Sequence, residues 1–192
     1  MGVDETRKNI LEVASKIFGK YGYKRTTIDE IARSAHKAKG SVYYYFVSKE
    51  DLFKEVVGNE LNVLKVELYR ISEGKEDPIN KLKNYLVTRM RLLSNAVNYH
   101  ETLKSNILDQ LDFVEDVKNE FYRYEAILLS RILKEGVENN VFKPIDYKMA
   151  SEVIIMVTKG LEMPFFLQYK YKELETRSEE LFNILMTGMT VK

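Results

Sequence analysis

The 192-residue chain contains no cysteine, which excludes a disulfide scaffold, a thiolate nucleophile and a zinc site of cysteine type. It has two histidines, His36 and His100, so little is available for histidine-based catalysis or metal binding. Three prolines and nine glycines are far fewer than a turn-dense β-sandwich needs. The composition favours an all-α protein, and neither a metal nor a cofactor is expected.

Long apolar runs are also missing. The longest unbroken run extends from Val153 to Val157, whereas a membrane-spanning helix needs roughly 20 residues. The charged residues from Asp4 to Lys8 are followed by no apolar stretch of the kind found in a secretory signal. We therefore expect a cytoplasmic protein that does not associate with membranes.

The net charge of +1 is distributed unevenly along the chain. Residues 1–47 carry 9 basic and 5 acidic side chains, whereas residues 48–192 carry 21 basic and 24 acidic ones. A small basic unit beside a faintly acidic larger one suggests that the N-terminal part contacts a polyanion. From charge alone, a solvated surface with uneven counts remains an equal alternative.

The N-terminal residues predict three short helices. Apolar residues at helical spacing predict a first helix that ends at Gly22, and the pair Thr27 and Glu30 forms a capping box that opens a second. A third helix is expected over about 38–45, with three residues facing inward, Ala38, Val42 and Phe46. Its outward face then carries Lys39, Gly40, Tyr43 and Tyr44. A cation, a glycine and two exposed phenols suit a helix that enters the major groove of DNA.

The rest of the chain also shows helical periodicity. One continuous helix is expected from after Ser48 through about Ile71, and Pro78 can occupy the first position of the next helix. Further helices are expected over 79–97, 102–113, 117–139, 147–168 and 174–187.

Two spaced motifs in the N-terminal part resemble the N-terminal domain of TetR-family transcriptional repressors. They are Thr26-Thr27-Ile28-x-x-Ile31-Ala32 and Lys39-Gly40-Ser41-Val42-Tyr43-Tyr44-Tyr45-Phe46-x-Ser48-Lys49-Glu50-x-Leu52. The match covers about residues 7–55. The resemblance implies an all-α homodimer with a helix-turn-helix DNA-binding domain over 1–47. A continuous helix would join it to a C-terminal helical domain over 48–192, which binds a small inducer and dimerises.

The resemblance also assigns roles on double-stranded operator DNA. Phosphate contacts are expected from Thr27, Tyr44, Tyr45 and Lys49, and groove-facing readers are expected to be Lys39, Gly40, Ser41 and Tyr43. Four residues depart from the family pattern. His36 replaces the usual glycine of the turn, Lys37 an aliphatic residue, Ala38 a capping Ser or Thr, and Tyr45 a frequent His. Histidine tolerates a positive φ, but the missing cap should cost the third helix about 1 kcal/mol.

The C-terminal domain has no motif that names a ligand. The expected pocket residues are Met90, Leu93, Phe113, Phe121, Tyr122, Met156, Met163, Phe166 and Tyr169. Because methionine and aromatic side chains line adaptable apolar sites, and nothing in the sequence resembles a charged cage, we expect a mainly apolar or aromatic inducer. The expected dimer interface comprises Val153, Val157, Gly160, Leu161, Leu181, Phe182, Leu185 and Met189.

Two other classes of function are alternatives to a transcriptional regulator. An all-α enzyme would need a nucleophile paired with a base, a glycine-rich phosphate loop or a metal-ligand spacing, and the sequence has none of these. A helical protein-interaction or ligand-binding module would use the basic N-terminus to bind acidic partners. Sequence-specific binding to duplex DNA separates the regulator from both.

Overall fold

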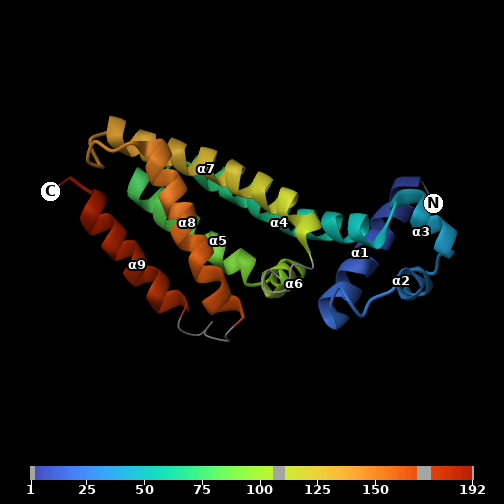
Figure 1. Ribbon diagram of the computed structural model, residues 1–192. Coiled ribbons are helices and arrows are strands. Elements are labelled where there is room, and N and C mark those ends of the chain that lie inside the picture. The colour runs from blue at the N-terminus through green and yellow to red at the C-terminus, as the bar shows by residue number, and fades with distance from the viewer. Residues whose placement is uncertain (1–2, 106–110, 168–173, 192) are drawn as a thin grey trace. The chain divides into compact units, whose positions relative to one another are not determined.

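The computed structural model describes residues 3–105, 111–167 and 174–191 (Figure 1). These residues form nine α-helices, one 3-10 helix and an isolated antiparallel bridge between Phe142 and Thr190. In chain order the helices are α1 (Val3–Tyr21), α2 (Ile28–Ser34), α3 (Lys39–Tyr45), α4 (Lys49–Ser72), α5 (Pro78–Leu93), α6 (Val97–Ser105), the 3-10 helix η1 (Asp112–Val114), α7 (Glu115–Glu138), α8 (Tyr147–Phe166) and α9 (Leu174–Met189). The all-α prediction is confirmed. Among the described helices, none is long and apolar enough to cross a membrane.

The chain forms two compact units. The first comprises residues 1–61 with 96–118, and the second comprises residues 62–95 with 119–192, within the described ranges. The boundary expected at residues 47/48 comes from the sequence motifs and stays a prediction. By packing, the first unit also contains the beginning of α4 and all of α6.

The first unit is built on the buried face of α1 and an aromatic cluster. The ring of Phe18 lies 5.0 Å from that of Phe53, and the ring of Tyr23 lies 4.9 Å from Phe53 and 5.3 Å from Phe113. Phe18 and Phe53 are almost fully buried. This core fixes α1 against α4, and it thereby supports the short helices α2 and α3.

Two residues with positive φ end the helices of the first unit. Gly22 (φ 81°) ends α1, and its N–H donates to the carbonyl of Phe18 at 2.8 Å. His36 (φ 53°) occupies the turn between α2 and α3, as expected from the glycine that the family pattern has there. The chain therefore reverses at this turn in a conformation that disfavours most side chains.

The prediction of one helix over 79–97 is wrong at its C-terminal end, because α5 stops at Leu93. The hydroxyl of Ser94 and the side-chain amide of Asn95 both donate to the carbonyl of Arg91, at 2.7 and 3.1 Å. Such side-chain bonds to nearby carbonyls compete with continued helix.

The prediction of a helix over 102–113 is also wrong, because α6 begins earlier, at Val97. A carboxylate from α4 accepts the first amides of α6: Glu60 binds the N–H of Asn98 at 3.2 Å and that of Tyr99 at 2.8 Å. The cap comes from a residue remote in sequence, so no local motif marks the helix start. The helices expected over 117–139, 147–168 and 174–187 agree with α7, α8 and α9 within two residues wherever the structure describes them.

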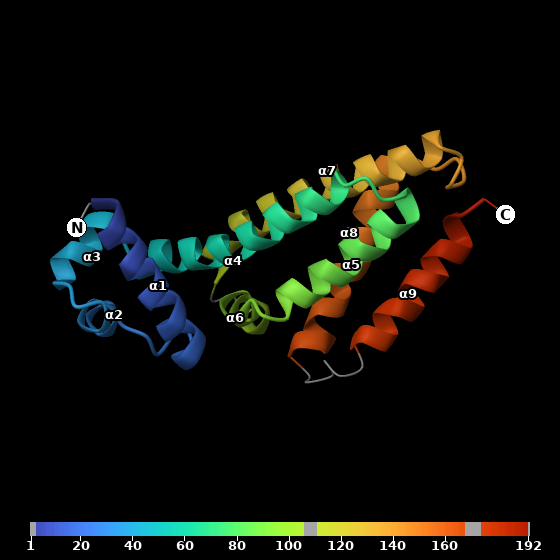
Figure 2. The ribbon, with the colours of Figure 1, turned by 180° about the vertical axis from the view of Figure 1, so that it is seen from behind.

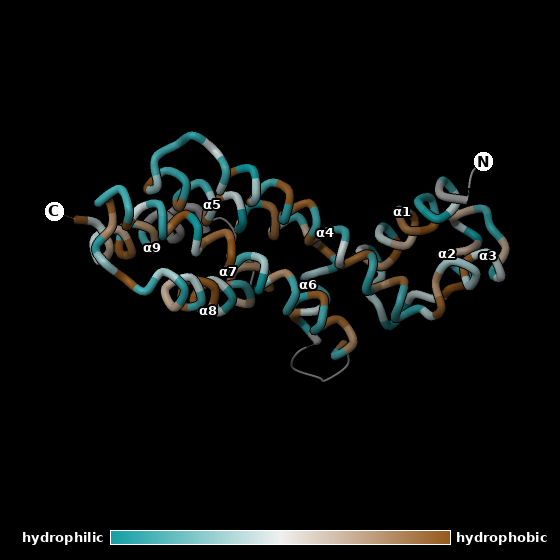
Figure 3. Tube along the Cα trace, turned by 90° about the horizontal axis from the view of Figure 1, so that it is seen from above, coloured by the Kyte–Doolittle hydropathy of each residue, from teal (hydrophilic) through white to brown (hydrophobic). Residues whose placement is uncertain are grey.

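The second unit packs amphipathic helices against one another. Helices α5 and α9 lie side by side, and the ammonium of Lys83 on α5 lies 5.9 Å from the ring of Phe182 on α9 (Figures 1 and 2). Hydrophobic and hydrophilic residues alternate along these helices, as Figure 3 shows. Near the end of α7, Gly136 accommodates the buried ring of Phe142, since a Cβ there would lie 2.0 Å from that ring.

Candidate nucleic-acid interface and a buried ionic centre

The beginning of α2 carries the predicted capping box. The Thr27 hydroxyl accepts from the N–H of Glu30 at 3.3 Å, and the Glu30 carboxylate accepts from the N–H of Thr27 at 2.8 Å. Hydrogen bonds from the N–H and the hydroxyl of Thr27 hold the pKa of the Glu30 carboxyl below its ordinary value. Thr27 is exposed, but both its N–H and its hydroxyl already have Glu30 as a partner.

The beginning of α3 lacks a side-chain cap, as the sequence predicts. Ala38 is the N-cap residue, has extended backbone, and makes no side-chain capping bond. Val42 and Phe46 are buried as expected, but the prediction that Ala38 also faces inward is wrong. An N-cap residue precedes the first helical position, so the helical repeat does not apply to it.

The outward face of α3 presents side chains of different kinds. Tyr44 is 76% exposed and Tyr43 is 47% exposed, while Tyr45 is half-buried and meets Tyr44 edge to face at 4.9 Å. Nothing lies within 4 Å of the position that a Cβ on Gly40 would occupy, and Ser41 is half-buried. The expected reader residues therefore form a surface that is open at Gly40 and flanked by phenols.

Lys39 is the charged residue of this surface, and it is paired within the protein. Its Nζ donates to Oδ2 of Asp29, on the first turn of α2, at 2.8 Å. This hydrogen bond and the charge of Asp29 raise the pKa of Lys39. Both side chains are about half exposed, so the pair can exchange partners with solvent or with a ligand.

Lys49, expected to contact phosphate, is bound to the protein backbone instead. Its Nζ donates to the carbonyls of Tyr23 and Thr26 at 3.1 and 3.2 Å and lies 4.2 Å from the centre of the Tyr23 ring. The Tyr23 hydroxyl donates in turn to Glu50 at 2.7 Å. Lys49 therefore fixes the α1–α2 connection to the beginning of α4, a role that the sequence motif does not reveal.

The expected pocket residues lie in three different environments. Met90, Leu93, Phe121 and Tyr122 are buried in the second unit, and half-buried Phe166 packs against Met90 and Phe165. Phe113 belongs to the aromatic cluster of the first unit. Met156 and Met163 are exposed on α8, and Tyr169 lies outside the described residues. The structure thus brings together only part of the expected set.

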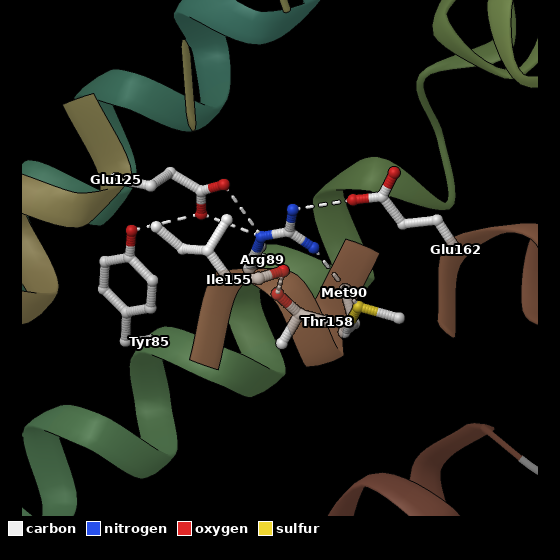
Figure 4. Close-up of polar contacts among 7 residues, drawn as sticks. All are labelled: Tyr85, Arg89, Met90, Glu125, Ile155, Thr158 and Glu162. Atoms are coloured by element: carbon white, nitrogen blue, oxygen red, sulfur yellow. Dashed lines mark hydrogen bonds and ion pairs between the residues drawn. The ribbon is translucent and has the colours of Figure 1, made fainter. Parts of the chain in front are cut away.

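The second unit also contains a buried ionic centre that the sequence analysis missed. Arg89 on α5 lies between Glu125 on α7 and Glu162 on α8, as Figure 4 shows. Its Nε donates to Glu125 at 2.8 Å and its Nη2 donates to Glu162 at 2.6 Å, while the Tyr85 hydroxyl donates to Glu125 at 3.1 Å. All four residues are at most 1% exposed. Three helices are thus joined at one guanidinium.

The charges of this centre bind one another, so the centre is an internal ion-pair network. Two carboxylates share one guanidinium, and burial raises the pKa of the Glu125 carboxyl above its ordinary value. Tyr85 and Arg89 are four residues apart and therefore share one face of α5. This spacing does not predict a buried ion pair, because an arginine on an amphipathic helix normally faces solvent. In the described ranges, no group of acidic or histidine side chains could hold a metal ion.

The expected dimer interface is exposed on α8 and mostly packed inward on α9. Val153 and Val157 are 51% and 40% exposed, and Gly160 has open space beside it. Leu161 packs against the Met90 and Phe165 core, Phe182 is buried, Leu185 and Met189 are half-buried, and the side chain of Leu181 lies outside the described residues. The exposed apolar residues of α8 are Met149, Val153, Met156, Val157 and Met163.

The fold and its exposed third helix define a helix-turn-helix protein, and known proteins that are similar to it agree. The family model for bacterial regulatory proteins of the tetR family matches residues 10–56. An HTH-type transcriptional regulator of Bacillus subtilis, YhgD, is 27% identical, with 99% of each chain covered. The transcriptional repressor KstR2 of Mycolicibacterium smegmatis is 29% identical over 72% of this chain and 68% of its own.

A solved structure extends the likeness to the whole fold. The regulator FadR of Bacillus subtilis, determined with stearoyl-CoA, has a TM-score of 0.77 at 19% identity and covers 94% of this chain and 98% of its own. The chain belongs to the TetR family of DNA-binding transcriptional regulators, which are not enzymes. The expectation from the two N-terminal motifs is thereby confirmed.

Proposed function

We propose that the protein is a repressor that binds a palindromic operator as a two-fold dimer and leaves it when a small ligand binds. The observation that carries the proposal is the outward face of α3, where Lys39 and the exposed Tyr43 and Tyr44 flank the open position of Gly40. A relative that is 29% identical over 143 residues, KstR2, is a transcriptional repressor. Binding to DNA also places the protein in the cytoplasm.

Within this proposal, the residues of α2, α3 and α4 divide the work on DNA. Lys39, Gly40, Ser41 and Tyr43 read the major groove, and Tyr44 and Tyr45 contact phosphates. Thr27 offers its hydroxyl to a phosphate while Glu30 retains the N–H. The Lys49 ammonium has three N–H groups, and two of them bind the carbonyls of Tyr23 and Thr26. The third contacts a phosphate, while the two carbonyl bonds hold the beginning of α4 against the α1–α2 connection.

The exposed apolar stripe of α8 supports dimerisation. The exposed apolar residues from Met149 to Met163 fall on one face of the helix and present apolar surface to solvent. A two-fold contact between copies would cover it. Replacing Val153 and Val157 with Glu should yield monomers in sedimentation at micromolar concentration, with much weaker operator binding. A parent that is already monomeric under those conditions contradicts the dimer.

The ligand is proposed to be small and mainly apolar or aromatic. Met90, Leu93, Phe121 and Tyr122 supply buried apolar surface, and the adjacent Arg89 centre supplies a polar end. Release from DNA requires that the ligand prefer the conformation that does not bind DNA, and tenfold induction needs about 1.4 kcal/mol of preference.

Selection of bound sites from random duplexes tests the DNA part of the proposal. A palindromic consensus with half-sites about one helical turn apart is expected. Lys39→Ala should relax specificity at one position of each half-site, whereas Tyr44→Phe should weaken all sequences alike. Recovery of no enriched sequence overturns the proposal.

A further inference from the structure

We propose that Asp29 is a specificity-determining residue that acts by holding Lys39, so that the lysine is withheld from phosphates of non-operator DNA. The proposal rests on the DNA-binding function above. It concerns a carboxylate on α2 that no motif of the sequence assigns to the interface.

The ion pair of Asp29 and Lys39 lies at the reading surface. Asp29 lies on the first turn of α2 and Lys39 is the first residue of α3, so their hydrogen bond of 2.8 Å joins the two helices at the reading surface. α3 has no acidic residue, and Lys39 is its one cation. The partner of the reader's only charge is therefore Asp29.

Among the described residues, the carboxylate of Asp29 is paired with Lys39, and its charge also favours the first turn of α2. Its neighbour Glu30 serves the capping box and accepts from Thr27, whereas the carboxylate of Asp29 has Lys39 as its hydrogen-bond partner. The side chains of Asp29 and Lys39 are 57% and 52% exposed, and ion pairs in such positions contribute little to stability. Stability alone therefore does not explain the pair.

The charge of Asp29 also bears on the beginning of α3. Ala38 provides no side-chain cap, and Lys39 places a positive charge where the helix dipole favours a negative one. The carboxylate of Asp29 lies beside that charge and offsets it. Asp29 thus orients both the lysine and the first turn of the reading helix.

The consequence concerns discrimination between sequences. A free lysine on this surface would bind any phosphate, which is the main source of sequence-independent affinity. A lysine held by Asp29 must give up its partner, and a base edge with acceptor atoms, such as guanine, compensates for that loss at the operator. The carboxylate also repels the phosphates of every duplex. Repulsion weakens binding to both kinds of duplex alike, whereas the holding of Lys39 lowers non-operator binding more than operator binding.

The test compares Asp29→Asn with the parent on two duplexes of equal length, the selected operator and a scrambled sequence, by fluorescence anisotropy at several salt concentrations. Asp29→Asn should tighten binding to the scrambled duplex several-fold at low salt and steepen its salt slope by about one unit per protomer, as expected for one additional phosphate contact. The ratio of operator to scrambled affinity should fall at least threefold.

Two control variants separate this mechanism from others. Glu67→Gln removes one negative charge from an exposed i, i+3 pair with Arg70 in the second unit, and it should leave the ratio unchanged. In a Lys39→Met background, Asp29→Asn should no longer lower the ratio, because the lysine through which it acts is gone. Asp29→Glu should retain most of the parent's discrimination.

The outcomes are distinct. An unchanged ratio in Asp29→Asn, an equal change in Glu67→Gln, or a persistent effect in the Lys39→Met background each overturns the role of Asp29. A parent that binds the operator no more tightly than the scrambled duplex instead contradicts the proposed function itself.

Discussion

Two ionic arrangements, one in each unit of the molecule, differ in exposure and therefore in what they can do. At the reading surface of the first unit, Lys39 and Asp29 are about half exposed and joined by one hydrogen bond. In the second unit, Arg89, Glu125 and Glu162 are at most 1% exposed and form a network. An exposed pair separates at little cost in water, whereas a buried one leaves an uncompensated charge when it is broken. The first arrangement suits exchange with DNA, and the second suits fixing helices in place.

The largest effect is expected from breaking the buried centre. Arg89→Leu leaves Glu125 and Glu162 without their shared cation and should reduce the free energy of unfolding by about 3–5 kcal/mol. Lys39→Ala at the exposed pair should change it by less than about 0.5 kcal/mol. Urea denaturation of both variants measures the contrast.

A combined variant serves as the control. Replacing Arg89 with Met and both glutamates with Leu removes every charge of the centre and should recover most of the lost stability, because burying charges is itself costly. Equal destabilisation by Arg89→Leu and Lys39→Ala would show that burial does not separate the two regions.

An intermediate effect is expected at Glu60, a half-buried acid of the first unit. Its carboxylate accepts from both nitrogens of Asn98 and from the N–H of Tyr99. Glutamine offers one acceptor oxygen where the carboxylate has two, so Glu60→Gln should destabilise the protein by about 1–3 kcal/mol.

The pH dependence of this variant sharpens the comparison. Burial raises the pKa of Glu60 above its ordinary value of 4.5, so the folded state binds this proton more tightly than the unfolded state does. The stability that the group contributes is then present below pH 4.5 and lost as the pH rises through the raised pKa. The difference between parent and Glu60→Gln should therefore shrink with rising pH in denaturation experiments. A difference that grows would contradict the raised pKa.

The smallest effect concerns backbone and not charge. His36 has a positive φ, so His36→Gly should stabilise the first unit by about 0.5 kcal/mol, the net of relieved strain and greater freedom of the unfolded chain. Lys37→Gly, at a neighbouring position without positive φ, should destabilise it. Thermal unfolding of the two variants gives the signs, and stabilisation by both would mean that the strain at His36 is not the cause.

What the sequence predicts correctly here is local. The capping box of Thr27 and Glu30, the stop at Gly22 and the inward Val42 each depend on neighbours within four residues. The beginning of α6 could not be predicted, because its cap is supplied by Glu60, 38 residues earlier. The Arg89 centre was missed for a similar reason, since its partners come from two other helices.

The same distinction applies to the interface. The exposure of Tyr43 and Tyr44 follows from the helical repeat of α3. The binding of Lys49 to the carbonyls of Tyr23 and Thr26 depends on how α4 packs against the α1–α2 connection, which no short motif encodes. The same residue types at the same spacing can therefore serve DNA or the fold.

The composition of the first unit from two separate stretches, 1–61 and 96–118, has a consequence for synthesis of the chain. When residue 61 has left the ribosome, Glu60 has no Asn98 to bind and the aromatic cluster lacks Phe113. At roughly 5–20 residues per second, several seconds separate the two stretches. The DNA-reading unit therefore completes its fold only after residues 62–95 of the other unit have emerged, so a nascent chain would acquire its complete reading unit with a delay.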